Sequence, residues 1–187
     1  MKTVYFDIDT QIDFMFPAGA LYASGAERIV RRVGELNRSA AAQGIVVVST
    51  MDAHTENDPE FQQWPPHCVV GTTAQAKPQA TLLEKRVIVP SAPAAFRLDG
   101  AQQVILEKQT TNCFTNANIQ EVLKELQADR YVVYGVVTEV CVYKAAVGLL
   151  GTGKRVEILT DAIIPLDPTA GVRALEELRT AGAVVMG

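Results

Sequence analysis

The segment Gly135-Val-Val-Thr-Glu-Val-Cys141-Val142 decides the fold. It follows the apolar run 131–136, which is typical of a buried parallel strand, and it leads into residues 142–150, which can continue as a helix. Cys141 is therefore expected in the first turn of a helix. Backbone N–H groups are unpaired there and the helix dipole is positive, so a thiol ionises more easily and an oxyanion can bind. From this segment alone, a small buried core cysteine is the alternative.

The composition is that of a globular chain. The 187 residues are 48% hydrophobic and 20% charged, which favours one domain over residues 1–187 with a sizeable core. A net charge of −4 without a basic stripe argues against nucleic acid or an anionic membrane as partner, and no apolar run reaches the roughly 18 residues of a membrane span. The N-terminus does not resemble a signal peptide, and the three cysteines are widely spaced. We therefore expect a reducing cytoplasm and no disulfide framework.

Strand and helix patterns alternate along the chain. Strands are predicted at residues 3–8, 45–50, 103–106, 131–136 and 155–159, with short candidates at 87–89 and 183–186. Helices are predicted at residues 26–43, 116–128, 142–150 and 168–181. This order predicts an α/β fold, a single-domain doubly wound three-layer sandwich with a mainly parallel sheet of about six strands.

Three of the predicted strands end in a reactive side chain: Asp9, Lys108 and Cys141. Because the carboxyl ends of strands in a doubly wound sheet share one edge, these residues can meet there. The Asp9 carboxylate could take the proton of Cys141, while Lys108 would favour the thiolate and keep the carboxylate ionised. Taken singly, Asp9 could cap a turn and Lys108 could be a solvated surface charge.

A second polar group lies in the long segment after the second strand. Asp52 and His54 are followed by Glu60 and His67. His54 and His67 are the only histidines of the chain. Imidazole and carboxylate oxygen suit Zn, Fe or Mn, and the Asp-x-His spacing places two ligands on one side of an extended segment. Trp64 and the prolines after it would form a rigid wall for a flat ring. The alternatives are two unrelated loop histidines and a tryptophan that packs on the core.

In this order, the residues resemble the cysteine hydrolases of the nicotinamidase/isochorismatase superfamily over essentially the whole chain. The resemblance is carried by Asp9-Thr-Gln-Ile-Asp13-Phe14, Asp52-Ala-His54, Trp64-Pro-Pro-His67-Cys-Val-Val-Gly71-Thr72, Lys108 and the segment 135–142. The Trp-Pro-Pro-His-Cys and Asp-x-His elements look like the nicotinamidase branch rather than the metal-free isochorismatase branch.

The resemblance implies a catalytic role for several positions. Cys141 matches the nucleophile, Asp9 the general acid and base, and Lys108 the third member of the triad. The family's non-proline cis peptide would fall between Val136 and Val137. The amides of Val137 and Cys141 would then form the oxyanion hole.

The resemblance also implies a metal site and a ring pocket. Asp52, His54 and His67 match ligands of a divalent metal, with zinc expected first and Fe or Mn as alternatives. Glu60 matches a further ligand, bound directly or through water. The substrate ring would lie between Phe14 and Trp64, beside Val137.

The function implied is a metal-dependent cysteine amidase that converts nicotinamide, or a close aromatic amide, to the acid and ammonia through a thioester. The metal would bind the pyridine nitrogen and orient the ring. One alternative is hydrolysis of another small amide, ureide, carbamoyl compound or vinyl ether, and another is a non-catalytic binding protein on the same scaffold. The expected partner is a small-molecule substrate, and association into a homo-oligomer is compatible with the family.

The sequence departs from the family pattern at several positions that line the pocket. After the triad lysine the family often has an aromatic residue and then a serine, where this chain has Thr111 and Asn112. Val140 precedes the nucleophile, where some nicotinamidases carry His or Tyr. The resemblance therefore supports the expected cysteine-hydrolase reaction better than it supports nicotinamide as the substrate. Cys68 and Cys113 are expected to be structural.

Overall fold

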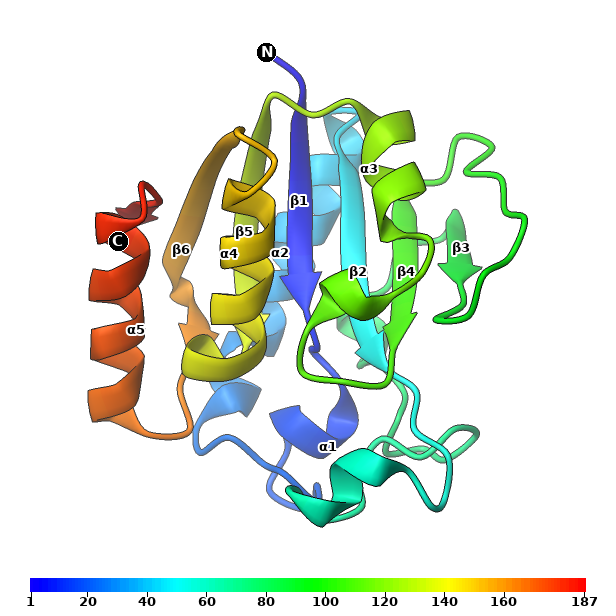
Figure 1. Cartoon of the computed structure of the whole chain (residues 1–187), viewed down its shortest axis with the longest axis vertical. Coiled ribbons are helices and arrows are strands. Elements are labelled where there is room, and N and C mark those ends of the chain that lie inside the picture. Colours follow the sequence, from blue (N-terminus) through cyan, green and yellow to red (C-terminus); the bar gives the residue numbers. More distant parts are fainter.

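The computed structural model describes all residues from Met1 to Gly187 and contains one seven-stranded parallel sheet (Figure 1). The strand order is β3-β4-β2-β1-β5-β6-β7. The strands are β1 (Thr3–Ile8), β2 (Val46–Asp52), β3 (Arg86–Val89), β4 (Gln103–Lys108), β5 (Arg130–Val136), β6 (Arg155–Ile164) and β7 (Val184–Met186). The predicted α/β sandwich is confirmed. The sheet has seven strands rather than about six because both short candidates pair, as the edge strands β3 and β7.

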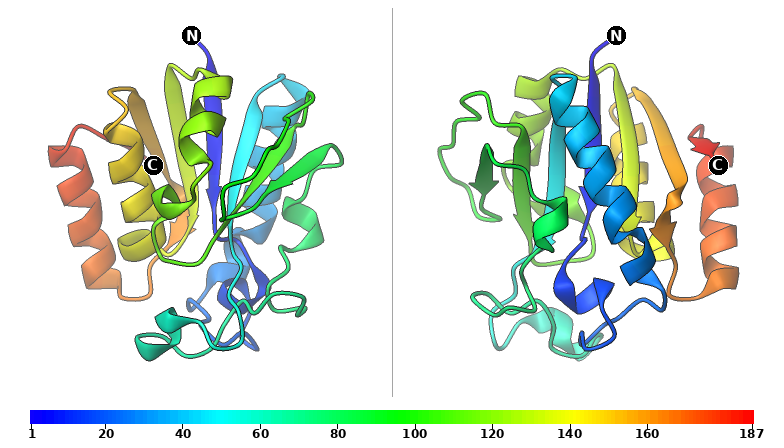
Figure 2. Two further views of the ribbon diagram at one scale, coloured as in Figure 1. Left: turned by 45° about the vertical axis from the view of Figure 1, so that its right-hand side comes forward. Right: turned by 180° about the vertical axis from the view of Figure 1, so that it is seen from behind.

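Five α-helices accompany the sheet. They are α1 (Ile12–Met15), α2 (Val30–Ala42), α3 (Ile119–Leu126), α4 (Tyr143–Leu150) and α5 (Pro168–Thr180). Helix α2 covers one face of the sheet and α3 and α4 cover the other, while α5 lies beside α4 near β7 (Figure 2). No helix has both the length and the apolar character needed to cross a membrane.

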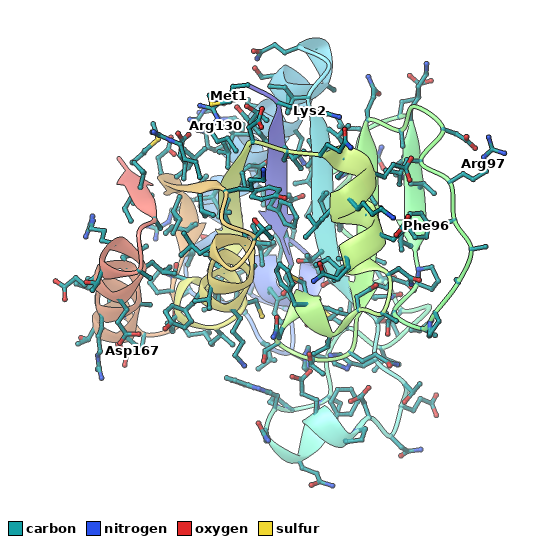
Figure 3. The ribbon with its side chains drawn as sticks, turned by 45° about the horizontal axis from the view of Figure 1, so that its top comes forward. Met1, Lys2, Phe96, Arg97, Arg130 and Asp167 are labelled. Atoms are coloured by element: carbon teal, nitrogen blue, oxygen red, sulfur yellow. The ribbon has the colours of Figure 1, made fainter.

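Two helix boundaries show how local side chains decide where a helix begins. Helix α5 begins as predicted, because the carboxylate of Asp167 (labelled in Figure 3) accepts hydrogen bonds from the N–H groups of Thr169 and Ala170. The helix predicted from residue 116 begins only at Ile119, and its predicted cap, Thr115, instead donates to the Asn112 carbonyl.

The reason for the later start is that the segment before α3 is tied to other parts of the chain. The Asn116 amide donates to the carbonyls of Pro90 and Glu107, and the Asn118 amide donates to those of Pro90 and Ala92. These bonds hold the segment in a non-helical conformation, because asparagine side chains compete with helical hydrogen bonding.

The segment around Cys141 adopts a wider turn than a plain α-helix start. Thr138–Val142 forms a π-helical turn that continues directly into α4. The small residues predicted to pack closely in α4 do so, since a Cβ atom at Gly148 would lie 2.2 Å from the Phe114 ring. Cys141 thereby lies beyond the carboxyl end of β5 and just before the N-terminus of α4.

A buried polar network lies on the α2 side of β1, separate from the candidate site residues Asp9, Lys108 and Cys141. Asp7 accepts hydrogen bonds from Asn37 (3.3 Å) and Ser49 (3.0 Å), and the Lys77 ammonium lies 3.5 Å from the same carboxylate. The Tyr134 hydroxyl donates to Asn37 over 2.6 Å. The apolar pattern of residues 3–8 gave no indication of this network, which ties β1, β2, β5 and α2 together.

Gly135 is the glycine whose replacement should cost most stability. It pairs with Ile8 across β1 and β5, has φ of +117°, and a Cβ atom there would lie 2.1 Å from the Ile8 carbonyl oxygen. Gly135→Ala is expected to lower the free energy of unfolding by about 3 kcal/mol or more, measured by urea denaturation. Gly153→Ala is the matched control, since φ is +72° but no atom lies within 4 Å. The free energy of unfolding of Gly153→Ala should fall by only about 1 kcal/mol, and equal decreases for the two variants would contradict the steric argument.

Candidate active site

The structure brings Asp9, Lys108 and Cys141 together at the carboxyl edge of the sheet, where the arrowheads of the central strands point in Figure 1. The Lys108 ammonium lies 2.8 Å from Asp9 Oδ2 and 4.0 Å from Cys141 Sγ. Asp9 and Lys108 are each 1% exposed and Cys141 is 9% exposed. Three side chains that are remote in the sequence thus form one buried, contiguous group.

The electrostatics of this group favour a protonated thiol and a charged lysine. Burial raises the pKa of Cys141 well above its usual range, and Lys108 offsets only part of that effect. Burial lowers the pKa of Lys108, but the Asp52 and Asp9 carboxylates outweigh it and hold that pKa above its ordinary value. The ease of ionisation expected from a helix N-terminus is therefore not found, because burial opposes it. A thiol in this setting needs a base to become a nucleophile.

Asp52 connects this group to the two histidines. One oxygen of its carboxylate, Oδ1, is ion-paired with Lys108. The other, Oδ2, lies 3.6 Å from His67 Nε2 and 3.8 Å from His54 Nε2. Glu60 Oε2 is 3.2 Å from His54 Nε2. All four residues predicted as metal ligands therefore lie in one cluster. Asp52 joins this cluster to the catalytic group, because one of its oxygens faces Lys108 and the other faces the two histidines.

The cluster has the donor atoms and the geometry of a metal site. Ligand atoms of Asp52, His54 and His67 lie within 4.8 Å of one another. His54 Nε2 and Glu60 Oε2 are buried without a hydrogen-bond partner, which is costly unless another group binds them. His67 Nδ1 donates to the Pro65 carbonyl over 2.8 Å, so its Nε2 keeps a free lone pair. These residues fit a divalent cation of the kind that imidazole and carboxylate bind.

The charges of the cluster also favour a bound cation. Burial lowers the pKa of His54, yet the Asp52 and Asp58 carboxylates outweigh burial and raise it. Burial and the nearby Asp52 carboxylate raise the pKa of Glu60. This crowding of buried carboxylates is what a bound cation would relieve.

A mostly apolar pocket adjoins both groups. Its lining residues are Phe14, Leu21, Asp52, Trp64, His67, Thr111, Val137, Val140, Cys141 and Leu166. The predicted ring-binding residues Phe14, Trp64 and Val137 are therefore placed around one cavity, with Cys141 and His67 at its wall. Leu21 and Leu166 were missed from the sequence, because they come from loops whose course depends on the fold. The peptide bond between Val136 and Val137 is cis.

Comparison with known proteins agrees with this architecture. The model of the isochorismatase domain matches residues 3–187. The chain belongs to the isochorismatase family. Within this family, it is 28% identical over 182 residues to a protein of Mycobacterium tuberculosis named nicotinamidase/pyrazinamidase, covering 93% of this chain and 92% of the relative.

Two solved structures illustrate the range of this family fold. The pyrazinamidase of Pyrococcus horikoshii, solved in complex with zinc, is 26% identical with a TM-score of 0.81, and the match covers 100% of this chain and 99% of that one. The N-carbamoylsarcosine amidase from Thermoplasma acidophilum has a TM-score of 0.78 at 23% identity, covering 99% and 95% of the two chains. At this identity, the comparison with the N-carbamoylsarcosine amidase shows a shared fold only.

Gln11 holds the backbone of Asp52 in this isochorismatase-family site. Its side chain accepts from the Asp52 N–H (2.7 Å) and donates to the Asp52 carbonyl (2.9 Å), as a neighbouring strand would. Asp13 similarly accepts from the Cys68 N–H over 2.7 Å, beside His67. Both residues belong to the segment that begins at Asp9, so their position in that motif was the available signal.

Asp58 is a further residue that sequence reasoning missed. Its Oδ2 lies 3.1 Å from His54 Nδ1, while its Oδ1 accepts from the Glu60 N–H over 3.0 Å. One carboxylate therefore contacts the His54 ring and also caps the turn that carries Glu60. The signal was the Asp-Pro pair at residues 58–59, which is typical of the start of a turn or helix.

Proposed function

We propose that the protein is a metal-dependent cysteine amidase that hydrolyses nicotinamide, or a close aromatic amide, to the acid and ammonia. The observation that carries this proposal is the position of Asp52, whose two oxygens face Lys108 on one side and the histidines on the other. The catalytic group, the candidate metal site and the apolar pocket are thereby contiguous. The relatives named nicotinamidase and pyrazinamidase support the same activity.

The proposed reaction uses Cys141 as nucleophile and Asp9 as general base. Asp9 takes the thiol proton, the sulfur attacks the amide carbonyl, and the oxyanion is stabilised by the amides of Val137 and Cys141. Asp9 then gives this proton to the amide nitrogen, the C–N bond breaks, and ammonia leaves while the acyl group stays on Cys141 as a thioester. Asp9 next activates the water that hydrolyses the thioester. Burial raises the pKa of Asp9, and the Lys108 ammonium, 2.8 Å away, opposes that rise and so favours the charged carboxylate that a base requires.

The residues proposed to hold the metal are Asp52, His54 and His67, with Glu60 bound directly or through water. Zinc is the first candidate and iron or manganese the alternatives, because all three accept imidazole and carboxylate ligands. When bound, the ion supplies a Lewis acid that can anchor a ring nitrogen. Phe14, Trp64 and Val137 would hold the ring against Cys141.

The decisive experiment measures ammonia release from nicotinamide by the purified protein, before and after chelation and again after zinc is restored. The proposal expects release that is lost with the chelator and recovered with zinc. Release that a chelator does not affect would remove the metal from the mechanism. No release from nicotinamide by zinc-loaded protein would refute this substrate, and small ureides and carbamoyl compounds would be assayed next.

Asp58→Asn is expected to weaken zinc binding about 10- to 100-fold, because a carboxylate behind a histidine ligand fixes the ring and raises its basicity. Competition with a chromogenic chelator measures the change. Asparagine can still accept from the Glu60 N–H, so the turn should persist. Asp167→Asn is the control, because Asp167 also caps a helix but lies at α5, outside the cluster. Equal zinc affinity for Asp58→Asn and wild type would contradict the assigned role.

A further inference from the structure

The Thr50 side chain on β2 is fully buried, and both of its hydrogen bonds are made to one residue, Asp9. Its oxygen accepts from the Asp9 N–H over 3.1 Å, and its hydroxyl hydrogen is donated to Asp9 Oδ1 over 2.6 Å. A hydroxyl has a single hydrogen, and here that hydrogen is committed to the carboxylate. The two bonds therefore fix the backbone and the side chain of Asp9 at the same time.

The two oxygens of Asp9 consequently have different surroundings. Oδ1 is held by Thr50, whereas Oδ2 faces the Lys108 ammonium and accepts no other hydrogen bond. Asp9 has φ of +46°, a conformation that is uncommon for residues other than glycine, so its backbone turns sharply where β1 ends. A carboxylate on such a turn could take several orientations without the Thr50 hydroxyl.

We infer that Thr50 is a positioning residue, whose hydroxyl orients the Asp9 carboxylate so that it can accept the proton of Cys141. Thr50 touches neither the pocket nor the candidate metal ligands through its hydroxyl, and it acts through Asp9 alone. The inference rests on the proposed role of Asp9 as base, and it goes beyond that role by naming the group that sets the geometry of the base.

The neighbouring residue Ser49 shows what a structural hydroxyl on the same strand does. Ser49 is equally buried, but it points to the other face of the sheet and donates to Asp7 over 3.0 Å. Removing either hydroxyl leaves a buried carboxylate with one donor fewer, so both changes should cost similar stability. Only the loss at Thr50 should affect the reaction.

The test compares Thr50→Val, which keeps the size of the side chain and removes the hydroxyl, with Thr50→Ser, which keeps the hydroxyl, and with Ser49→Ala. Thr50→Val is expected to lower kcat for nicotinamide by roughly 10- to 100-fold, with KM within about twofold and zinc content unchanged. Alkylation of Cys141 by iodoacetamide in metal-free protein should slow by about tenfold. Thr50→Ser and Ser49→Ala should stay within about threefold of wild type in both assays.

Several results would overturn the inference. One is a Thr50→Val enzyme that keeps kcat and Cys141 reactivity, and another is a Thr50→Ser enzyme as impaired as Thr50→Val, since volume rather than the hydroxyl would then matter. A change in KM and zinc content in place of kcat would show that Thr50 acts through Asp52. If Thr50→Val does not fold, judged by circular dichroism, Thr50→Ala serves the same comparison. The alkylation assay needs no substrate, so the inference can hold or fail independently of the proposed activity on nicotinamide.

Discussion

Cys141→Ala is expected to lower the rate of nicotinamide hydrolysis by roughly 10⁴-fold or more, the largest effect of any single substitution in this protein. The thiol is the group that would bond to the acyl carbon, and Cys141 is the one cysteine among the residues that line the pocket. The apolar wall and the metal cluster would remain, so nicotinamide should still bind. Ammonia release gives the rate, and trapping with hydroxylamine gives the intermediate. Wild type should yield the hydroxamate and Cys141→Ala should yield none.

Cys113→Ala is the matched control for this prediction. Cys113 is 2% exposed, and burial raises its pKa to about 12, so it is an unreactive core thiol beside the same edge of the sheet. Its replacement should leave kcat within about threefold of wild type, although the core loses packing. Substantial hydrolysis by Cys141→Ala, with hydroxamate still formed, would place the nucleophile elsewhere.

Much of the fold could be predicted because its signals are local. Strands β1 and β5 are buried on both faces, so their sequences are almost continuously apolar. The Asp167-Pro168 pair marks the start of α5 by a cap that the sequence itself contains. The meeting of Asp9, Lys108 and Cys141 followed from topology alone, since each ends a parallel strand.

What could not be predicted depends on partners that lie far away in the chain. Thr50 and Gln11 each bond to a residue 41 positions away, and nothing adjacent to either of them indicates that partner. The same holds for the pair of Asp7 and Lys77. Asp7 lies in a strand whose other residues are mostly apolar, and Lys77 comes from the long segment between β2 and β3. The ionisation of Cys141 was misjudged for a related reason. The helix dipole is a local property, whereas the burial that outweighs it is set by the whole fold.

Lys108→Met is expected to abolish most activity and to destabilise the protein as well. Its ammonium lies between the Asp9 and Asp52 carboxylates, and its removal leaves two buried like charges without a counter-ion. We expect kcat to fall by about 10³-fold and the free energy of unfolding of metal-free protein to fall by about 3–5 kcal/mol. Urea denaturation and ammonia release measure the two losses. Bound zinc should offset part of the stability loss, because a cation beside Asp52 replaces some of the missing charge.

The pH dependence of that loss tests its electrostatic origin. Burial already raises the pKa of Asp9, and without the Lys108 ammonium that pKa rises further above its unfolded value. The folded state then binds a proton more tightly and gains stability as the pH falls. The destabilisation should therefore be smaller at about pH 5 than at about pH 8. Lys77→Met is the control, because the Lys77 side chain is likewise only 1% exposed and is paired with Asp7. Its ammonium also donates to the Thr50 backbone carbonyl, but it bonds to neither the Thr50 hydroxyl nor Asp9. It should lose comparable stability while the folded enzyme keeps kcat within about threefold. If Lys108→Met also retained the kcat of wild type, Lys108 would be a structural counter-ion, and Asp9 would have to work as a base without it.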